Sequence, residues 1–478
     1  MYDVVIIGAG VVGSATAYYL SQYNLSVALL EASNDVSNKT SKANSAIIHA
    51  GYDPKEGTLM ARLNVKGAKL AKEICEKLDV SYKQVGALVL AFTHEDLDTI
   101  NMLYKRGIKN GVEDLHILNY QETKDIEPAI SDNVLGALYA GTSAIISPWE
   151  YTLAMAETAV RNGVDLKLSN KVTAISKEND IFTITTNQNT YQCRYIINAA
   201  GVDADTVHEL IGKKEFTIRP SKGQYHLLDK PQGKKVKHTV FQCPSKEGKG
   251  VLVSPTVHGN LIVGPDSKGS DKNDSSTTAD ELSFIKKQAA LSIPTIDYRD
   301  DIRNFAGVRA RSDRSDFIVE ESASVPGMFN LAGICSPGLS AAPAIALEAV
   351  KWILNKEHYT ITKKDSYIDS RKQVKFRNLS DEERAKIVAE NPAYGRIVCR
   401  CETVTEGEIL DALKGPIPPC SIEGVKRRCH SSMGRCQGGF CAERVAMILM
   451  RELNLSYEQL LQNQEGTNIL LNEAKGGY

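Results

Sequence analysis

The chain has 478 residues, of which 42% are hydrophobic and 24% charged, and its formal net charge is −1. This balance excludes a strong global field that would attract nucleic acid or an anionic membrane. No apolar run reaches the roughly 18–20 residues that a spanning helix needs. Since no signal peptide precedes the first strand, we expect a cytoplasmic protein with several domains. A peripheral membrane contact through a partner stays possible.

A βαβ pattern fills residues 2–31. An apolar run of strand length is followed by a glycine-rich turn, a helical stretch and a second strand that ends at Glu31. Glycines at this spacing allow a tight turn and bring the backbone at the helix start against a pyrophosphate. Glu31 stands where an acidic residue accepts the ribose hydroxyls. The segment predicts a dinucleotide site, and its glycines are Gly8, Gly10 and Gly13.

Further α/β elements follow. We expect helices over 151–162 and 341–354, strands over 171–176, 182–186, 195–197 and 329–332, and antiparallel strands within 216–228 and 251–265. A polar loop covers 266–278. Residues 355–392 are charged and poor in large apolar side chains, which indicates a connector with a helix over 381–390.

Six of the ten cysteines crowd into the C-terminal part of the chain. Four of them form a C-x-C pair, a long gap and a C-x4-C pair. Structural zinc sites more often use pairs with two to four intervening residues, whereas four thiolates suit a [2Fe–2S] cluster. We expect an iron–sulfur module and keep zinc and an unmetallated helical module as alternatives. The four expected ligands are Cys399, Cys401, Cys436 and Cys441.

Several segments resemble the D-amino-acid-oxidase-like superfamily of FAD oxidoreductases over about residues 1–355. Besides the fingerprint, they are SKANSAIIHAG (41–51), YIINAAG (195–201) and NLAGICSPGLSAAPAIA (330–346). MARLNVKG (60–67), RPSKGQYHLL (219–228) and GVLVSPTVHGNLIVGP (250–265) carry a narrower resemblance to L-2-hydroxyglutarate dehydrogenases and flavin-linked glycerol-3-phosphate dehydrogenases. VCRCETVTEGEI (398–409) and MGRCQGGFC (433–441) resemble the bacterioferritin-associated-ferredoxin-like [2Fe–2S] domain.

The resemblance implies an α/β fold, α+β overall, with a Rossmann-like FAD-binding domain, an interleaved antiparallel-sheet substrate domain and a small helical [2Fe–2S] module. FAD-binding parts are expected at about 1–75, 150–215 and 305–355, substrate parts at 76–149 and 216–304, a connector at 356–392, the module at 393–453 and a tail at 454–478. Small residues near Ser41 suit a flat isoalloxazine, and the helix start after Gly333 suits a reduced flavin's negative charge. The further residues that the resemblance implies for FAD are Asn44, Ser45, Val172, Ala200, Gly201, Gly338, Leu339 and Ser340.

The substrates of these relatives are small anions with a secondary alcohol. The resemblance makes Arg309 the anion clamp in preference to Arg311, because a guanidinium fork fits a carboxylate or a phosphate. A surface ion pair of Arg309 with Asp313 or Asp316 is the alternative. His49 is the expected base for the hydroxyl proton, or else a histidine that only hydrogen-bonds flavin or backbone. His258 and Lys222 are secondary catalytic candidates from strands expected to roof the pocket.

A basic run, Lys426-Arg427-Arg428, and Arg435 lie among the cysteines. Three interpretations are open: these residues form a solvated face, their positive charge raises the potential of the cluster, or they dock an acidic partner. No interleaved aromatics support binding to nucleic acid.

These features predict an FAD-dependent dehydrogenase that oxidises glycerol 3-phosphate and passes electrons through the fused cluster to a one-electron acceptor or a partner flavoprotein subunit. An L-2-hydroxyglutarate or other 2-hydroxy-acid dehydrogenase is the first alternative. An amino-acid or amine dehydrogenase and a non-catalytic electron-transfer subunit are the others.

Overall fold

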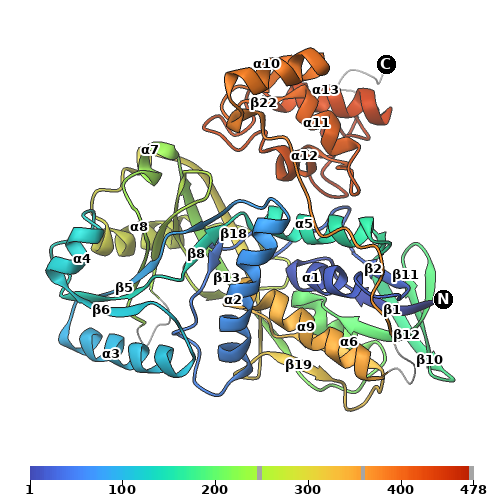
Figure 1. The fold of residues 1–478 in the computed structure, drawn as a ribbon, viewed down its shortest axis with the longest axis horizontal. Helices are drawn as coiled ribbons and strands as arrows, with labels where there is room; N and C mark the ends of the chain where they lie inside the picture. The colour runs from blue at the N-terminus through green and yellow to red at the C-terminus, as the bar shows by residue number, and fades with distance from the viewer. Residues whose placement is uncertain (245–249, 357–360, 473–478) are drawn as a thin grey trace.

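The computed structural model of the chain describes residues 1–244, 250–356 and 361–472. Figure 1 shows a catalytic region in two parts, one around β1 and α1 and one around β5 and α8, with the C-terminal module above them near α5. The architecture is α/β, α+β overall, as the sequence predicts. Within the described residues, every helix is too short or too polar to cross a lipid bilayer.

The first sheet has a parallel centre. β1 pairs in parallel with β2 and β12, β2 with β9, and β12 with β20, while β10, β11 and β19 add antiparallel strands. Val4, Val5 and Ile6 are fully buried, because helices cover the central strands. The strands are β1 (Tyr2–Ile7), β2 (Val27–Leu30), β9 (Asp165–Lys167), β10 (Val172–Glu178), β11 (Ile181–Thr186), β12 (Thr190–Asn198), β19 (Ile318–Glu321) and β20 (Met328–Ala332).

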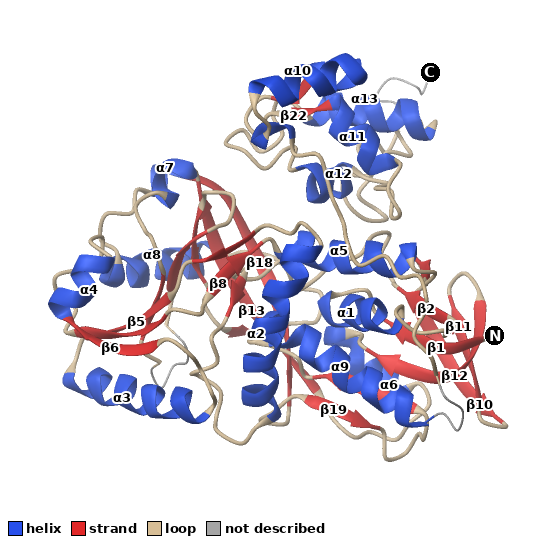
Figure 2. Ribbon diagram, in the orientation of Figure 1, coloured by secondary structure: helices blue, strands red, loops and turns tan. Residues whose placement is uncertain are grey.

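Helices pack on this sheet and on one another: α1 against α5 and α9, α2 against α9, and α6 against β12 and β20 (Figure 2). The last helix begins earlier than expected, at Gly338, so that its first turn belongs to the site described below. The helices are α1 (Val11–Leu20), α2 (Leu59–Lys77), α5 (Pro148–Arg161), α6 (Ala204–Glu209) and α9 (Gly338–Lys356).

The second sheet is mainly antiparallel and has the order β17-β13-β16-β15-β14-β5-β7-β6, with β18 along β13. Its strands are β5 (Ala87–Ala91), β6 (Leu115–Asn119), β7 (Gly136–Ala140), β13 (Ile218–Leu228), β14 (Thr239–Gln242), β15 (Leu252–Pro255), β16 (Leu261–Gly264), β17 (Lys268–Gly269) and β18 (Asp301–Ser312). The helices of this part are α3 (His94–Lys109), α4 (Tyr120–Ile126), α7 (Lys230–Gly233) and α8 (Ala279–Ser292). A small sheet of β3 (Ile47–Ile48), β4 (Tyr82–Gln84) and β8 (Ala144–Ile146) lies alongside.

The connector is fixed to the catalytic region rather than solvated. The Asp369 carboxylate accepts a hydrogen bond from the Tyr18 hydroxyl and pairs with Lys77 at 2.7 Å. Arg371 is buried and pairs with Glu157 of α5 at 2.6 Å. The expected helix is present as α10 (Asp381–Glu390), with a capping box at Ser380.

The C-terminal module has its own apolar core, which includes Val425, Val445 and Leu449. Its elements are β21 (Ile397–Cys399), β22 (Val404–Thr405), α11 (Glu406–Leu413), α12 (Ile422–Cys429) and α13 (Ala442–Leu453). Leu460, from the segment to which the sequence assigned no structure, is fully buried in the same core.

Candidate active site

The glycine turn between β1 and α1 is closed by backbone contact. A Cβ on Gly13 would lie 1.9 Å from the Gly8 carbonyl oxygen, so this approach requires glycine. The Glu31 carboxylate accepts hydrogen bonds from the Ala9 N–H at 2.7 Å and the Ser33 N–H at 2.8 Å. These bonds fix the end of β2 beside the turn, where a ribose would lie.

A cavity of about 300 Å³ opens at the start of α1. The structure brings to its wall nine of the predicted residues: Gly10, Ser41, Asn44, Ser45, His49, Gly201, Arg309, Gly338 and Leu339. Ser340 lies one layer back, where its Oγ accepts a hydrogen bond from the His49 N–H at 2.8 Å. Ala200 lies between the wall residues Ala199 and Gly201. Gly333 follows β20, and Val172 begins β10; neither is part of the wall.

The segment from Ser41 to Ser45 forms one side of this cavity and is fixed at several points. The Ser41 Oγ accepts a hydrogen bond from the Val11 N–H at 2.8 Å, which satisfies a free donor at the helix start. The Asn44 side chain bonds the backbone of its own turn. The Ser45 Oγ and the Tyr225 hydroxyl are 3.2 Å apart. Opposite, a Cβ on Gly307 would lie 1.9 Å from the Ala43 carbonyl oxygen, so β18 passes directly against the segment.

Arg309 extends from β18 into the same cavity. Its Nη1 donates to the Ser221 Oγ at 3.4 Å and the Lys222 carbonyl at 3.3 Å, and its Nη2 donates to the Asp266 carbonyl at 3.0 Å. All three acceptors are neutral. Asp313 and Asp316 accept backbone N–H bonds elsewhere, from Thr217 and from Leu59 and Met60. The alternative of a surface ion pair is therefore not what the structure shows.

Gly223 makes room for this arginine. A Cβ on Gly223 would lie 2.1 Å from the Arg309 Nη2. Since Ser221 is directly opposite Arg309 in the strand pair, Ser221 and Gly223 share the face that carries the guanidinium, and Lys222 points to the other face.

Lys222 is accordingly not a pocket residue, contrary to the expectation from the sequence. Its ammonium pairs with Asp274 at 2.7 Å and donates to the Ser276 Oγ at 3.2 Å, both in the polar loop after β16. The reason is that successive side chains of a strand point to opposite faces of the sheet, so Lys222 points away from the face that carries Arg309.

His258 is also misplaced by the sequence argument. It lies in the tight turn between β15 and β16, which the Gly259 N–H closes on the Thr256 carbonyl. Its ring centroid is 4.0 Å from that of His430 in the cysteine module. This turn is at the end of the sheet that meets the module rather than over the cavity.

His49 follows β3 and contributes to the cavity wall, with its ring centroid 5.8 Å from that of Phe241. The sequence argument missed Tyr225 and Phe241, which line the cavity from the substrate sheet. The alternating pattern of 216–228 contains Tyr225, but the register that turns it inward depends on β18, which is distant in sequence.

These residues fit FAD. The closed glycine turn and the Glu31 carboxylate suit the pyrophosphate and ribose, and the cavity is bounded by small residues and backbone where a flat ring system needs close approach. At the cavity end, Gly338 and Leu339 of the first turn of α9 line the wall, and the positive end of the helix dipole there suits negative charge.

The four predicted ligand cysteines converge in the module. The Cys401 and Cys436 sulfurs are 3.6 Å apart. A hydrogen bond from the Cys399 thiol lowers the pKa of Cys441 to about 6, toward the thiolate that metal ligation needs. Burial alone would raise the pKa of Cys436, but the backbone N–H groups of Phe440 and Gly438 point at its sulfur and lower that pKa. This donor set fits a [2Fe–2S] cluster, whose sulfurs take such hydrogen bonds.

The two cysteines of the C-terminal six that are not expected ligands contact backbone carbonyls. Cys420 lies against the Asn34 carbonyl and Cys429 against the Glu408 carbonyl, each at 3.4 Å.

The basic run is neither a solvated face nor a docking site for an acidic partner. Arg427 and Arg428 are buried and bind the carboxylate of Asp35 in the FAD-binding part, at 2.7 Å and 2.8 Å. Burial alone would raise the pKa of Asp35, but Arg428 and Arg427 outweigh it and lower that pKa to about 2. The run therefore joins the module to the catalytic region, while Arg435 remains exposed.

Comparisons with known proteins agree with this geometry. Residues 3–352 match the family model of FAD dependent oxidoreductases, and residues 397–451 match the BFD-like [2Fe-2S] binding domain. The chain is 49% identical over 477 residues to a glycerol 3-phosphate dehydrogenase from Caloramator mitchellensis, with 99% of each chain covered. It is 30% identical over 281 residues to the human mitochondrial L-2-hydroxyglutarate dehydrogenase, covering 55% of this chain and 60% of that one.

Among solved structures, it is similar to the FAD-bound L-alpha-glycerophosphate oxidase from Mycoplasma pneumoniae. The TM-score is 0.73 at 34% identity, over 77% of this chain and 98% of that one. The chain is thus a member of the FAD-dependent oxidoreductase family, with a BFD-like [2Fe–2S] domain at its C-terminal end.

Proposed function

We propose that this protein oxidises glycerol 3-phosphate to dihydroxyacetone phosphate and passes the electrons through its [2Fe–2S] cluster to a one-electron acceptor or a partner flavoprotein. The observation that carries the proposal is the Arg309 guanidinium, which faces the flavin cavity and, within the described part of the chain, bonds neutral oxygens. A cation held this way is ready for an anionic substrate, and its fork matches a phosphate.

The residues around Arg309 define the remaining roles. Arg309 binds the phosphate and so fixes the distance from the anion to the secondary alcohol. His49 accepts the hydroxyl proton, and the bond from its backbone to Ser340 keeps it at the cavity wall. Bound flavin supplies the two-electron hydride acceptor, and the cluster a one-electron carrier.

The relatives support the choice of substrate. The Caloramator mitchellensis protein, named as a glycerol 3-phosphate dehydrogenase, aligns over 99% of this chain, cysteine module included. The human L-2-hydroxyglutarate dehydrogenase aligns over 55%. A fused one-electron carrier is of little use when oxygen is the oxidant, so we propose a dehydrogenase with poor oxygen reactivity.

The test is anaerobic flavin reduction with a substrate panel. Glycerol 3-phosphate should bleach the flavin rapidly, while L-2-hydroxyglutarate, amino acids and unphosphorylated glycerol should not. Faster bleaching by a 2-hydroxy acid or an amino acid would replace the proposed substrate. If no compound bleaches the flavin, the protein is an electron-transfer subunit.

A further inference from the structure

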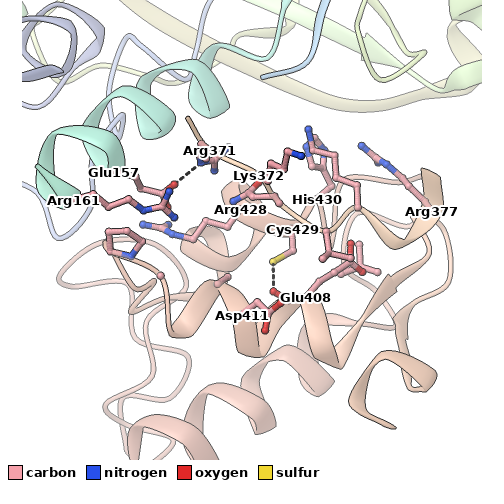
Figure 3. A pocket seen from close by; sticks show the side chains of 17 residues that line it. Glu157, Arg161, Arg371, Lys372, Arg377, Glu408, Asp411, Arg428, Cys429 and His430 are labelled. Carbon is pink, nitrogen blue, oxygen red and sulfur yellow. Dashed lines mark hydrogen bonds and ion pairs between the residues drawn. The ribbon is translucent and has the colours of Figure 1, made fainter. Parts of the chain in front are cut away.

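A second cavity, of about 170 Å³, lies where the connector and α5 meet the cysteine module. It is separate from the flavin site. Figure 3 shows Arg371 and Lys372 of the connector between Glu157 of α5 and His430 of the module. The wall therefore combines three segments that are distant in sequence.

Cationic side chains outnumber carboxylates in this wall. Among the described residues, six cations line it, against the three carboxylates of Glu157, Glu408 and Asp411. Three of the cations pair with carboxylates outside the wall: Arg377 with Glu402, Lys375 with Glu150 and Arg428 with Asp35. The carboxylates already have donors: Glu157 has Arg371, Glu408 has the Phe376 and Thr405 backbone, and Asp411 has the Tyr394 hydroxyl.

Arg371 is the least exposed cation of the group. It is only 2% exposed, and its Nε donates to Glu157 Oε2 at 2.6 Å. Among the residues that the structure describes, its two terminal nitrogens have no hydrogen-bond partner. A buried charged donor without a partner is costly, so this half of the guanidinium fork is available for a ligand in the cavity.

His430 presents a second donor to the same cavity. It ends α12 in a left-handed conformation, with φ 64°, and is 4% exposed. Within the described part of the chain, neither ring nitrogen has a hydrogen-bond partner. Burial and the nearby His258 lower the pKa of His430, so the neutral ring offers one N–H.

A metal ion is a competing ligand for His430, since Glu150, His258 and His430 place ligand atoms within 4.8 Å of one another. The charges oppose it. The Lys375 ammonium is 3.2 Å from Glu150 Oε1, and Arg371 and Arg377 add further positive charge around the group. A divalent cation bound by this group would have to share the Glu150 carboxylate with the Lys375 ammonium.

We propose that this cavity between the connector, α5 and the module binds a small phosphate-bearing anion. Its oxygens would accept hydrogen bonds from the terminal nitrogens of Arg371 and from the His430 ring. Because the wall combines the connector and the module, the bound anion would strengthen the attachment of the module to the catalytic region.

Calorimetric titration of the FAD- and cluster-loaded full chain with inorganic phosphate, at constant ionic strength set with chloride, tests the proposal. The flavin cavity also attracts phosphate, so Arg309→Lys serves to remove that site. We expect Arg309→Lys to keep one phosphate site, and Arg309→Lys/Arg371→Lys to bind it roughly 10-fold more weakly or not at all, because lysine keeps the charge beside Glu157 but loses the fork.

Arg299→Gln, at an exposed arginine of the substrate sheet, is the matched control and should leave phosphate binding unchanged. If the Arg371 variant loses its flavin or cluster, His430→Gln in the Arg309→Lys background replaces it, with the same expected loss. Equal phosphate affinity with and without the substitution overturns the proposal. So does an Arg309→Lys protein that binds no phosphate.

Discussion

The flavin cavity and the contact between module and catalytic region place charge in opposite ways. In the cavity, the oxygens that Arg309 bonds among the described residues are all neutral, so no described carboxylate pairs with its charge. In the contact, Asp35 lies between Arg427 and Arg428, and all three are buried. An uncompensated charge marks where a charged ligand binds, whereas a compensated one marks where two parts of the chain join. Arg371 combines the two: its Nε pairs with Glu157, whereas its terminal nitrogens have no hydrogen-bond partner among the described residues.

Cys436→Ser should give the largest difference in effect between the module and the flavin cavity. Loss of a cluster ligand should remove or destabilise the cluster and abolish turnover with the natural acceptor. Substrate should still bleach the flavin, and a small dye that meets the flavin directly should still support turnover, because the FAD-binding part has its own core. Cys420→Ser, at a cysteine outside the four ligands, is the control and should keep its iron.

Two results of that experiment would contradict the relay. A folded, FAD-loaded Cys436→Ser protein that no longer reduces its flavin would make the module part of the active site. Full turnover with the natural acceptor would mean that electrons leave by another route.

His49→Gln should affect only the cavity. Loss of a general base slows the chemical step by about 10²–10⁴-fold, so the rate of flavin reduction at saturating substrate should fall by that order. Thermal stability and iron content should stay as in the wild type. A rise in KM with unchanged kcat would instead show that His49 only helps to bind substrate.

Asp35→Asn should instead weaken the attachment of the module and leave the flavin cavity unaffected. Removing the charge that compensates two buried guanidiniums costs about 3–5 kcal/mol, seen as a lower free energy of unfolding or as module detachment, with flavin reduction retained. Asp132→Asn, at an exposed ion pair with Lys124, should have little effect. Equal stability of the two variants would show that the buried pair does not hold the module.

The same pair gives a pH dependence. Folding lowers the pKa of Asp35 to about 2 from its ordinary 3.8. The stabilisation is therefore fully present above about pH 4 and is lost as the pH falls toward 2. The wild type should lose this part of its stability in that window, and Asp35→Asn should not.

Sequence patterns predicted the site where function depends on local backbone. The glycine turn and the segment from Ser41 each place their residues within a few positions of one another, and the cysteines form two close pairs. The sequence patterns failed where the surroundings of a residue depend on tertiary contacts. The partner of Arg427 and Arg428 is Asp35, nearly the whole chain away, so no local signal could identify the run as buried. The direction of the Lys222 side chain depends on the register of β13 with β18, and the surroundings of His258 depend on where the module lies.

The smallest predicted effect sharpens the assignment within the cavity itself. Arg309 and Arg311 both line it, two residues apart on β18. Only Arg309 is held by Ser221, Lys222 and Asp266 in the space that Gly223 leaves open. Arg309→Lys keeps the charge but loses the fork, so KM for glycerol 3-phosphate should rise about 10–100-fold, the equivalent of a charge-assisted hydrogen bond. Arg311→Lys should change KM much less, and FAD content should be normal in both. If Arg311→Lys has the larger effect, the clamp is the neighbouring arginine, and the phosphate lies one residue pair further along the strand.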